Sequence, residues 1–485
     1  MTKISFSLLL VSIFAFTICC ASSAFGFQTD SPIADAMQKK DWKGVLSELK
    51  NEADVSAAQA DGMTALHWAV HQGDTTKSCY LIERGADANA KTNYNVTPLS
   101  LACERGHAAI VKRMIKADPE LDLESKRLGS ETPLMLAARN GNAELVEALV
   151  EAGAELDAKE VNGQNALMWA AANGNTAVVD VLVKAGADYE HATKAGFTPL
   201  MFAARQGKTE TVMRLLDEGI DVNTVMKPKK SSGRNPKAGT SAMSLAIDSG
   251  HFELALRLVA KGADPNDARS GMAPLHAITM VRKTERGESA AGDPPPRITG
   301  SVNSLDFVRE IVKLGADINH QLKKKPKSVG KGRLNSQGMT PFIYASRTAD
   351  IALMELFLEL GADPMLVNAD GATALMAAAG VGVIAVGEEA GTVEEVNRAI
   401  ELLVELGIDV NVVDKNKETA MHGAAYRSFP ETATLLAKLG ADPEIWNAKN
   451  KLGWTPHLIA SGKRPGSVKP DPAMKAALDA AMGQE

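Results

Sequence analysis

Residues 380–391, GVGVIAVGEEAG, have a spacing that could bind a nucleotide. Gly380, Gly382 and Ala385 match a dinucleotide fingerprint, whose glycines let the backbone approach a pyrophosphate at the N-terminus of a helix. The spacing has this meaning only where a strand precedes it and a helix follows it. Gly207-Lys208-Thr209 ends like a phosphate loop, but Phe202 occupies the position of that loop's first glycine. The elements around both stretches therefore decide whether either one does chemistry.

Histidine, cysteine and methionine are the other residue types that could bind a metal or react. The sequence has nine His and four Cys, and it contains no Cys-x-x-Cys, His-Glu-x-x-His, Gly-x-Ser-x-Gly or calcium-loop pattern. Met135, Met168 and Met201 recur at a constant spacing, which favours core packing; an adaptable partner surface or a copper(I) site are the alternatives. We predict no catalytic residue, no metal site and no cofactor.

The first 26 residues read as a signal peptide. Lys3 gives a positive start, residues 4–20 are a continuous apolar run, and small residues follow that permit cleavage after Ala24 or Gly26. A retained N-terminal membrane anchor is the alternative. We therefore expect an exported chain, periplasmic or secreted, in which only Cys79 and Cys103 remain; two thiols in a chain of this size are not a disulfide scaffold.

A tetrad recurs along the rest of the chain with a period near 33 residues. It begins as Thr64-Ala65-Leu66-His67, and its eleven copies start at residues 64, 97, 132, 165, 198, 241, 273, 340, 373, 419 and 455. Small residues follow each copy, then an apolar helical run and a close variant of Gly-Ala-Asp. Thr caps a helix, Pro suits its first turn, and Gly ends the second helix in the left-handed conformation. The pattern predicts a repeating helix-turn-helix unit.

This pattern resembles the ankyrin repeat, a turn followed by two antiparallel helices. The resemblance implies an all-α repeat solenoid of about eleven helix-turn-helix repeats with loop insertions. A degenerate capping repeat is expected at 31–60, the repeat array at 61–471, and a capping helix and tail at 472–485. The insertions are expected at 224–240, 281–302, 322–338 and 380–392. His67, His276 and His422 fill the last tetrad position, where the family commonly has a structural histidine.

The repeat register resolves the question of the glycine stretch. Residues 373–379 are predicted to form the first helix of a repeat, and the segment from Val393 supplies its second helix. The stretch then joins two helices and has no strand before it, so we predict a loop that does not bind nucleotide. Insertion 281–302 likewise joins the two helices of one repeat. We expect both to lie on the edge opposite the turn fingers between repeats.

The insertions at the turn fingers are strongly basic and contain no acidic residue in their charged core. We predict that they bind an acidic or polyanionic partner surface, with two solvated loops as the alternative. The basic candidates are Lys227, Lys229, Lys230, Arg234, Lys237, Lys323, Lys324, Lys325, Lys327, Lys331 and Arg333. Both loops are expected to project from the same edge. Nucleic acid is not expected, because these loops have no stacking aromatics and the net charge of the chain is −6.

Repeat positions late in each inner helix supply a second set of candidates, since the repeat leaves their identity free on the concave face. The concave-face candidates are Gln72, Arg105, Arg139, Asn140, Asn173 and Arg205. The resemblance implies a scaffold that binds a protein partner of unknown identity and is not an enzyme. The signal peptide adds the expectation of export, and we expect a monomer. The alternatives are an enzyme or cofactor-binding protein that uses the inserted loops, and a secreted effector.

Overall fold

A computed structural model describes residues 31–228, 237–283, 296–323, 334–383, 386–387, 390–463 and 469–483. These residues form 25 helices. The prediction of an all-α repeat solenoid is confirmed. The chain divides into two compact units, here called the N-terminal unit (Thr2–Asp221 with Lys227–Lys230) and the C-terminal unit (Val222–Met226 with Ser231–Glu485).

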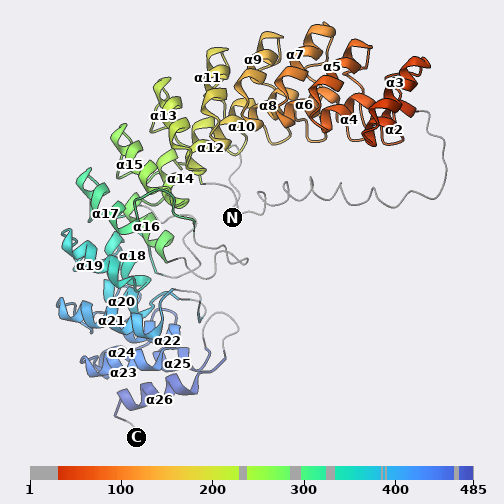
Figure 1. Cartoon of the computed structure of the whole chain (residues 1–485). Coiled ribbons are helices and arrows are strands. Elements are labelled where there is room, and N and C mark those ends of the chain that lie inside the picture. Colours follow the sequence, from red (N-terminus) through yellow and green to blue (C-terminus); the bar gives the residue numbers. More distant parts are fainter. Residues whose placement is uncertain are drawn as a thin grey trace. The chain divides into compact units, whose positions relative to one another are not determined.

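The N-terminal unit consists of six antiparallel helix pairs in two layers (Figure 1). Even-numbered helices form the inner layer and odd-numbered helices the outer layer, and each helix packs on its counterpart in the next pair. Its helices are α2 (Pro32–Gln38), α3 (Trp42–Lys50), α4 (Ala65–His71), α5 (Thr75–Glu83), α6 (Pro98–Arg105), α7 (Ala108–Ala117), α8 (Pro133–Asn140), α9 (Ala143–Glu151), α10 (Ala166–Asn173), α11 (Thr176–Lys184), α12 (Pro199–Arg205) and α13 (Thr209–Asp217).

The C-terminal unit also has six pairs, with one extra short helix, α24, among the described residues. Its inner layer is α14, α16, α18, α20, α22 and α25, and α26 closes the outer layer against α23. Its helices are α14 (Ala242–Asp248), α15 (Phe252–Ala260), α16 (Pro274–Arg282), α17 (Ser304–Lys313), α18 (Pro341–Arg347), α19 (Ile351–Glu359), α20 (Ala374–Ala379), α21 (Val393–Glu405), α22 (Ala420–Arg427), α23 (Pro430–Lys438), α24 (Pro443–Trp446), α25 (Pro456–Ala460) and α26 (Pro472–Ala481).

The tetrad starts each inner helix in the way its residue types predict. At α6, the Thr97 hydroxyl accepts a hydrogen bond from the backbone N–H of Ser100 at 3.0 Å, and Pro98 occupies the first turn. Leu99 is fully buried beneath this cap. After the second helix of the preceding pair, Gly85 has φ +87°, the left-handed value that ends a helix. Capping and core packing therefore select the same register in every repeat.

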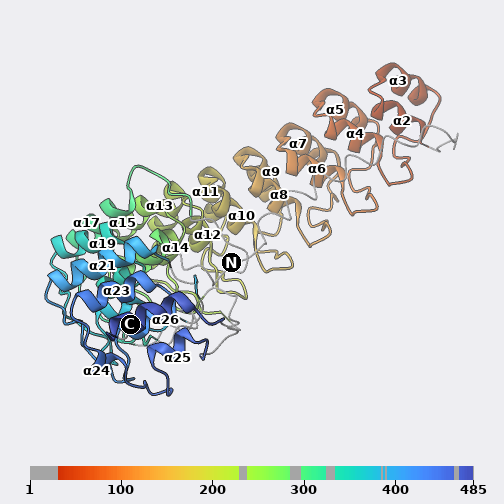
Figure 2. The same ribbon diagram turned by 90° about the horizontal axis from the view of Figure 1, so that it is seen from below.

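Between repeats, the chain forms turn fingers that lie side by side along the N-terminal unit (Figure 2). One backbone hydrogen bond closes an ordinary finger, as where Thr92 N–H donates to Val96 O at 3.0 Å. The same bond closes the two basic insertions: Met226 N–H donates to Thr240 O at 2.8 Å, and Leu322 N–H donates to Met339 O at 3.2 Å. Each insertion therefore replaces the tip of a finger and leaves its base intact.

Across the described residues, we find no helix that is both long enough and apolar enough to span a bilayer.

Candidate protein-binding surface

The inner face of the N-terminal unit displays aromatic side chains at one repeated position. Trp68, Trp169 and Phe202 each follow directly after the tetrad, on α4, α10 and α12, and each is half-buried. The residues of the inner helices before them are buried, so the aromatic ring is the first part of each of these helices that reaches the surface. Leu101 and Leu136 occupy the same position on α6 and α8 and are buried. We call the side chains at this position of α4, α6, α8, α10 and α12 the aromatic stripe. The stripe is aromatic at both ends and aliphatic in its middle.

Arg139 links this stripe to a group of charged residues. Its guanidinium lies over the Trp169 ring at 5.2 Å from the ring centre. One amino group donates to Glu104 at 3.2 Å, and Arg127 donates to the other carboxylate oxygen of Glu104 at 3.1 Å. Burial opposes the ionisation of Glu104, but the two guanidinium groups outweigh it and lower the pKa of this carboxyl group. Arg139 is therefore held in place, with part of its charge facing solvent.

The other concave-face candidates lie at the ends of the same inner helices. The amide of Asn140 donates to the backbone carbonyl of Glu104 at 3.1 Å, so it joins the Arg139 group. Arg105 contacts the His71 ring nitrogen at 2.9 Å, and Arg205 lies 5.7 Å from the Phe197 ring centre. Both arginines are exposed. They extend the cationic and aromatic face along the N-terminal unit.

Two concave-face candidates, Gln72 and Asn173, make hydrogen bonds within the repeat array. The side chain of Gln72 donates to the backbone carbonyl of Met37 at 2.7 Å and ties α4 to the opening pair. Asn173 donates to the carbonyl of Trp169 at 2.8 Å within α10. These bonds occupy one donor of each amide, so Gln72 and Asn173 contribute less to an outward-facing surface than the arginines.

Three of the basic finger residues lie within the described part of the chain. Lys227, at the start of the first basic insertion, and Lys237, near its end, are exposed, as is Lys323 in the second insertion. The remaining candidates lie outside the described residues: Lys229, Lys230, Arg234, Lys324, Lys325, Lys327, Lys331 and Arg333.

The inner helices α18, α20 and α22 of the C-terminal unit are buried along their whole length. Part of their cover comes from the insertions. Leu334, Val381 and Val383 are buried, and a β-carbon added to Gly382 would lie 2.4 Å from the backbone nitrogen of Leu334. The expectation that finger insertions and helix-joining insertions stay on opposite edges is wrong for this pair. Apolar side chains in both segments bring them together over the inner helices.

A buried ion pair fastens the end of α16 to the start of α19. Arg282 makes two parallel hydrogen bonds to Asp350, at 2.7 and 3.0 Å, and a third to the Ser304 hydroxyl at 2.6 Å. The side chains of Arg282 and Asp350 are only 19% and 4% exposed. Asp350 also caps α19 by accepting the N–H of Leu353. The geometry is that of a bidentate guanidinium–carboxylate pair, the strongest type of ionic contact in proteins.

The next two cations extend this arrangement. Lys283 donates to Glu395 at 2.8 Å and to the Ala349 carbonyl at 2.9 Å. Burial raises the pKa of Glu395, but the lysine outweighs that effect, so its pKa falls. Arg427, at the end of α22, donates to the carbonyls of Arg347 and Ala390 at 2.8 and 3.2 Å. Cations at the ends of these inner helices therefore bind the helix-joining insertions to the repeats.

The tetrad histidines have structural contacts. The Nδ1 of His67 accepts the N–H of Thr64 at 3.1 Å, so its Nε2 carries the hydrogen and donates to Val96 O at 3.0 Å. His276 makes the matching Nε2 bond to Met339 O at 3.1 Å, although 63 residues separate the two. Burial lowers the pKa of His276 to about 3 and that of His422 to about 4. His67 and His276 are therefore neutral linkers between repeats, whereas the ring of His422 accepts the N–H of Thr419 in its own repeat.

The remaining chemical candidates belong to the core or to helix ends. Met135, Met168 and Met201 are buried, which confirms the packing interpretation, and Cys103 is buried as well. Gly380 has φ +106° and ends α20, so the element before the glycine stretch is a helix. The described residues hold no cluster of three or more His, Cys, Asp or Glu side chains that could bind a metal ion.

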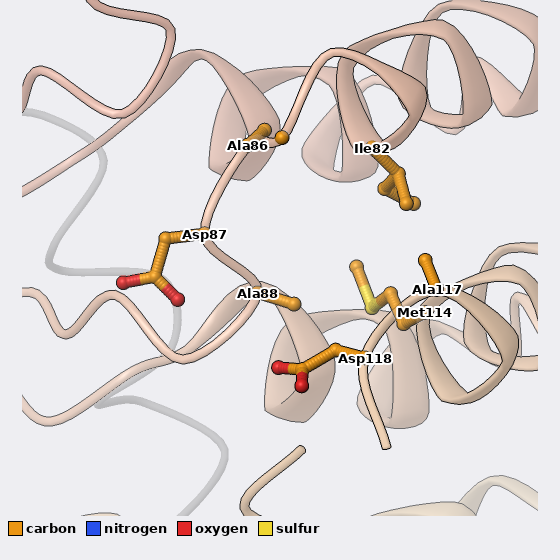
Figure 3. A pocket seen from close by; sticks show the side chains of 8 residues that line it. Ile82, Ala86, Asp87, Ala88, Met114, Ala117 and Asp118 are labelled. Carbon is orange, nitrogen blue, oxygen red and sulfur yellow. The ribbon is translucent and has the colours of Figure 1, made fainter. Parts of the chain in front are cut away.

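A hollow of about 290 Å³ lies between α5 and α7 on the outer layer (Figure 3). Ile82, Ala88 and Met114 form its apolar wall, and the carboxylates of Asp87 and Asp118 lie at one side. Both carboxylates accept backbone N–H groups of their own turns, from Asn89 at 2.7 Å and from Glu120 at 3.0 Å. The hollow is a gap between repeats whose polar groups already serve the turns.

Comparison with known proteins agrees with the repeat geometry in both units. Family models described as ankyrin repeats (3 copies) match residues 36–127, 119–193 and 187–269, and one described as ankyrin repeats (many copies) matches residues 394–437. The chain belongs to the ankyrin-repeat family. Ankyrin repeats generally mediate protein–protein interaction and are generally non-enzymatic scaffolds.

One curated protein to which the chain is similar is the potassium channel AKT3 of Oryza sativa subsp. japonica. It is 38% identical to this ankyrin-repeat chain over 80 residues, which is 16% of this chain. The match spans only 9% of the channel's length.

The aromatic stripe is a feature that the sequence interpretation missed. Its signal was available, because Trp68, Trp169 and Phe202 all stand one residue after the tetrad. In a chain with 5% aromatic residues, two of five Trp at one repeat position is an informative pattern. Repeat-by-repeat comparison of that position would have found the stripe.

Proposed function

We propose that this ankyrin-repeat chain is an exported, monomeric adaptor that binds a protein partner through the inner face of its N-terminal unit. The observation that supports this most directly is the group formed by Arg139, Trp169 and Glu104. Trp and Arg are the residues enriched at the energetic centre of protein interfaces, and here each is held by the other before any partner arrives. A side chain that is already positioned loses less freedom on binding.

The proposal assigns binding to the N-terminal unit because its inner face has functional side chains that reach solvent. Arg105 and Arg205 are exposed there, and the aromatic rings are half-buried. In the C-terminal unit, α18, α20 and α22 have no exposed residue to offer. A partner that approached those helices would first have to displace the segments packed on them.

The basic fingers indicate that the partner has an acidic surface. Lys227, Lys237 and Lys323 are exposed, and their fingers keep the hydrogen-bonded base of an ordinary finger. Fingers are part of the surface that repeat proteins present to partners. An acidic protein surface would be attracted to them, with an association that weakens as salt rises. Export rests on the signal-like residues 1–26.

Cross-linking and pull-down of the mature chain in cells tests the proposed surface. We expect Trp169→Ala with Arg139→Ala to lose a partner that the native chain recovers. Lys112→Ala, an exposed change on the outer helix α7, should keep it. Arg139→Ala alone keeps Trp169, so a loss of the partner in this variant does not come from a folding defect at the tryptophan. Circular dichroism checks the fold of each variant.

A further variant, with all eleven finger charges replaced by Ser, separates the two surfaces. A partner lost only in that variant would place recognition on the fingers rather than on the inner face. A partner list unchanged in every variant would show that neither surface binds it.

A further inference from the structure

Three neighbouring fingers of the N-terminal unit each expose one large apolar side chain. Tyr94, Leu128 and Val161 are 67%, 66% and 64% exposed. They lie at the tips of the fingers that precede α6, α8 and α10. Scattered apolar residues at a surface are ordinary, but three at successive repeats form a row. We call these three side chains the fingertip row.

The three fingers are held side by side by hydrogen bonds between them. Val161 N–H donates to Gly129 O at 3.1 Å, which places two tips in contact. Between the first and second fingers, the N–H of Asp122 donates to the side-chain oxygen of Asn89 at 2.9 Å, and the hydroxyls of Thr97 and Ser125 lie 3.4 Å apart. The row is therefore a fixed ridge of the repeat unit rather than three independent loops.

Each apolar tip has a lysine two or three residues before it. Lys91 precedes Tyr94, Lys126 precedes Leu128 and Lys159 precedes Val161, and all three lysines are exposed. One of them, Lys91, lies 3.8 Å from Asp122 at the surface. Each of the three fingers therefore carries one exposed cation and one exposed apolar side chain close together in sequence.

Two acidic side chains near the fingertip row, Glu160 and Glu131, are bonded within the repeats. The carboxylate of Glu160 is buried and accepts the N–H groups of Asn162 and Gln164, at 2.9 and 3.0 Å. Glu131, in the middle finger, lies 3.6 Å from Arg139 on the inner face. These two carboxylates therefore serve a turn and the inner face, so the chemistry at the fingertip row itself is basic and apolar. The exposed Glu120 and Glu155 stand earlier in their fingers, before the lysines.

We propose that the fingertip row is a docking surface for an anionic lipid bilayer. Isolated apolar side chains that protrude from convex loops suit a bilayer interface, where each one enters the headgroup boundary separately. Flanking lysines add attraction to anionic headgroups. The core of a protein interface, by contrast, packs large side chains into shape-complementary pockets of a partner. The fingertip row adjoins the inner face, since Glu131 of the middle finger lies 3.6 Å from Arg139. It uses different side chains and takes a different ligand, so it goes beyond the proposed partner binding.

Co-sedimentation of the mature full-length chain with vesicles tests the assignment. We expect binding to phosphatidylcholine vesicles that contain phosphatidylglycerol, and weaker binding to pure phosphatidylcholine. Replacing Tyr94, Leu128 and Val161 together by Ser should weaken binding to the anionic vesicles roughly tenfold or more, because three apolar contacts are lost. Replacing Lys91, Lys126 and Lys159 by Gln should remove the preference for phosphatidylglycerol.

A matched control uses half-exposed apolar residues of the C-terminal unit. Met365→Ser, Val413→Ser and Leu452→Ser together should leave vesicle binding unchanged. The proposal is overturned if the native chain sediments with neither vesicle, or if the fingertip serine variant binds as the native chain does. Loss of vesicle binding only in the variant without the eleven basic finger charges would also overturn it. If the native chain does not bind vesicles but needs the fingertip row to bind a protein partner, the row is a protein-binding site instead.

Discussion

Arginines at equivalent repeat positions have opposite environments in the two units. Arg139 and Arg205 in the N-terminal unit and Arg347 in the C-terminal unit all stand seven residues after the helix cap. Arg205 is exposed and Arg139 is half-buried, whereas Arg347 is 5% exposed. Arg105 and Arg427 stand eight residues after their caps, and they are exposed and 3% exposed respectively.

The difference shows that the repeat fixes the position of a residue in the inner helix, but not which segments surround its side chain. In the N-terminal unit the helix-joining loops are short, so the ends of the inner helices stay open to solvent. In the C-terminal unit the longer insertions return over those ends, as the contact of Gly382 with Leu334 and the bonds of Arg427 to Ala390 demonstrate. The same residue type at the same position is open to solvent in one unit and buried and structural in the other.

The largest effect is expected at the buried ion pair of the C-terminal unit. Arg282→Met should lower the free energy of unfolding of this unit by about 3–5 kcal/mol, because it leaves the Asp350 carboxylate buried without its cation. Denaturant unfolding, with hydrogen exchange of α18–α21 to locate the change, measures it. Adding Asp350→Asn should recover part of the loss, since the amide can still cap α19. The exposed pair Lys313–Glu310 is the control, and Lys313→Met should change stability by less than about 1 kcal/mol.

A smaller effect, and a direct test of the comparison, comes from removing one arginine in each unit. Arg427→Ala leaves the carbonyls of Arg347 and Ala390 without this donor, so we expect a loss of about 2–4 kcal/mol in unfolding free energy. Arg105→Ala removes an exposed side chain and should cost less than about 1 kcal/mol. Equal losses in urea unfolding would show that the environment of these positions does not matter.

The smallest effect is the change in stability that one buried histidine contributes between pH 7 and pH 5, about 2 kcal/mol. The pKa of His276 is about 3 and that of His422 about 4 in the folded chain, against 6.5 for an unperturbed histidine. Below pH 6.5 the unfolded chain binds protons that the folded chain does not, so stability is greatest above this pH and falls toward pH 4. The slope approaches about 1.4 kcal/mol per pH unit for each histidine. Urea unfolding of the native chain and of His276→Gln at pH 7 and pH 5 measures it; the variant should show the weaker dependence.

The sequence was sufficient to predict the repeats, because the residues of each repeat indicate where its helices begin and end. Thr97 and Pro98 signal a helix start, Gly85 signals a helix end, and buried Leu99 lies between them, so local signals and core packing agree. The arginines of the inner face could also be found, since they occupy the positions that the repeat leaves variable.

What the sequence could not provide was the path of the insertions. Leu334 and Gly382 are 48 residues apart, and no sequence pattern in either segment predicts that they are in contact. The bond of Arg282 to Asp350 spans 68 residues for the same reason. Contacts of this kind depend on how irregular segments fold over a finished scaffold, and no periodic pattern encodes them.

The closed base of each finger has a consequence for how such a chain can change over evolutionary time. The bond from Met226 to Thr240 encloses a long segment, yet it matches the bond from Thr92 to Val96 around an ordinary turn. The entropy lost on closing a loop grows only with the logarithm of its length, so a doubling costs about 0.6 kcal/mol. Finger tips are therefore points where new sequence can enter without disturbing the helices, and a repeat scaffold of this kind can acquire new recognition segments one finger at a time.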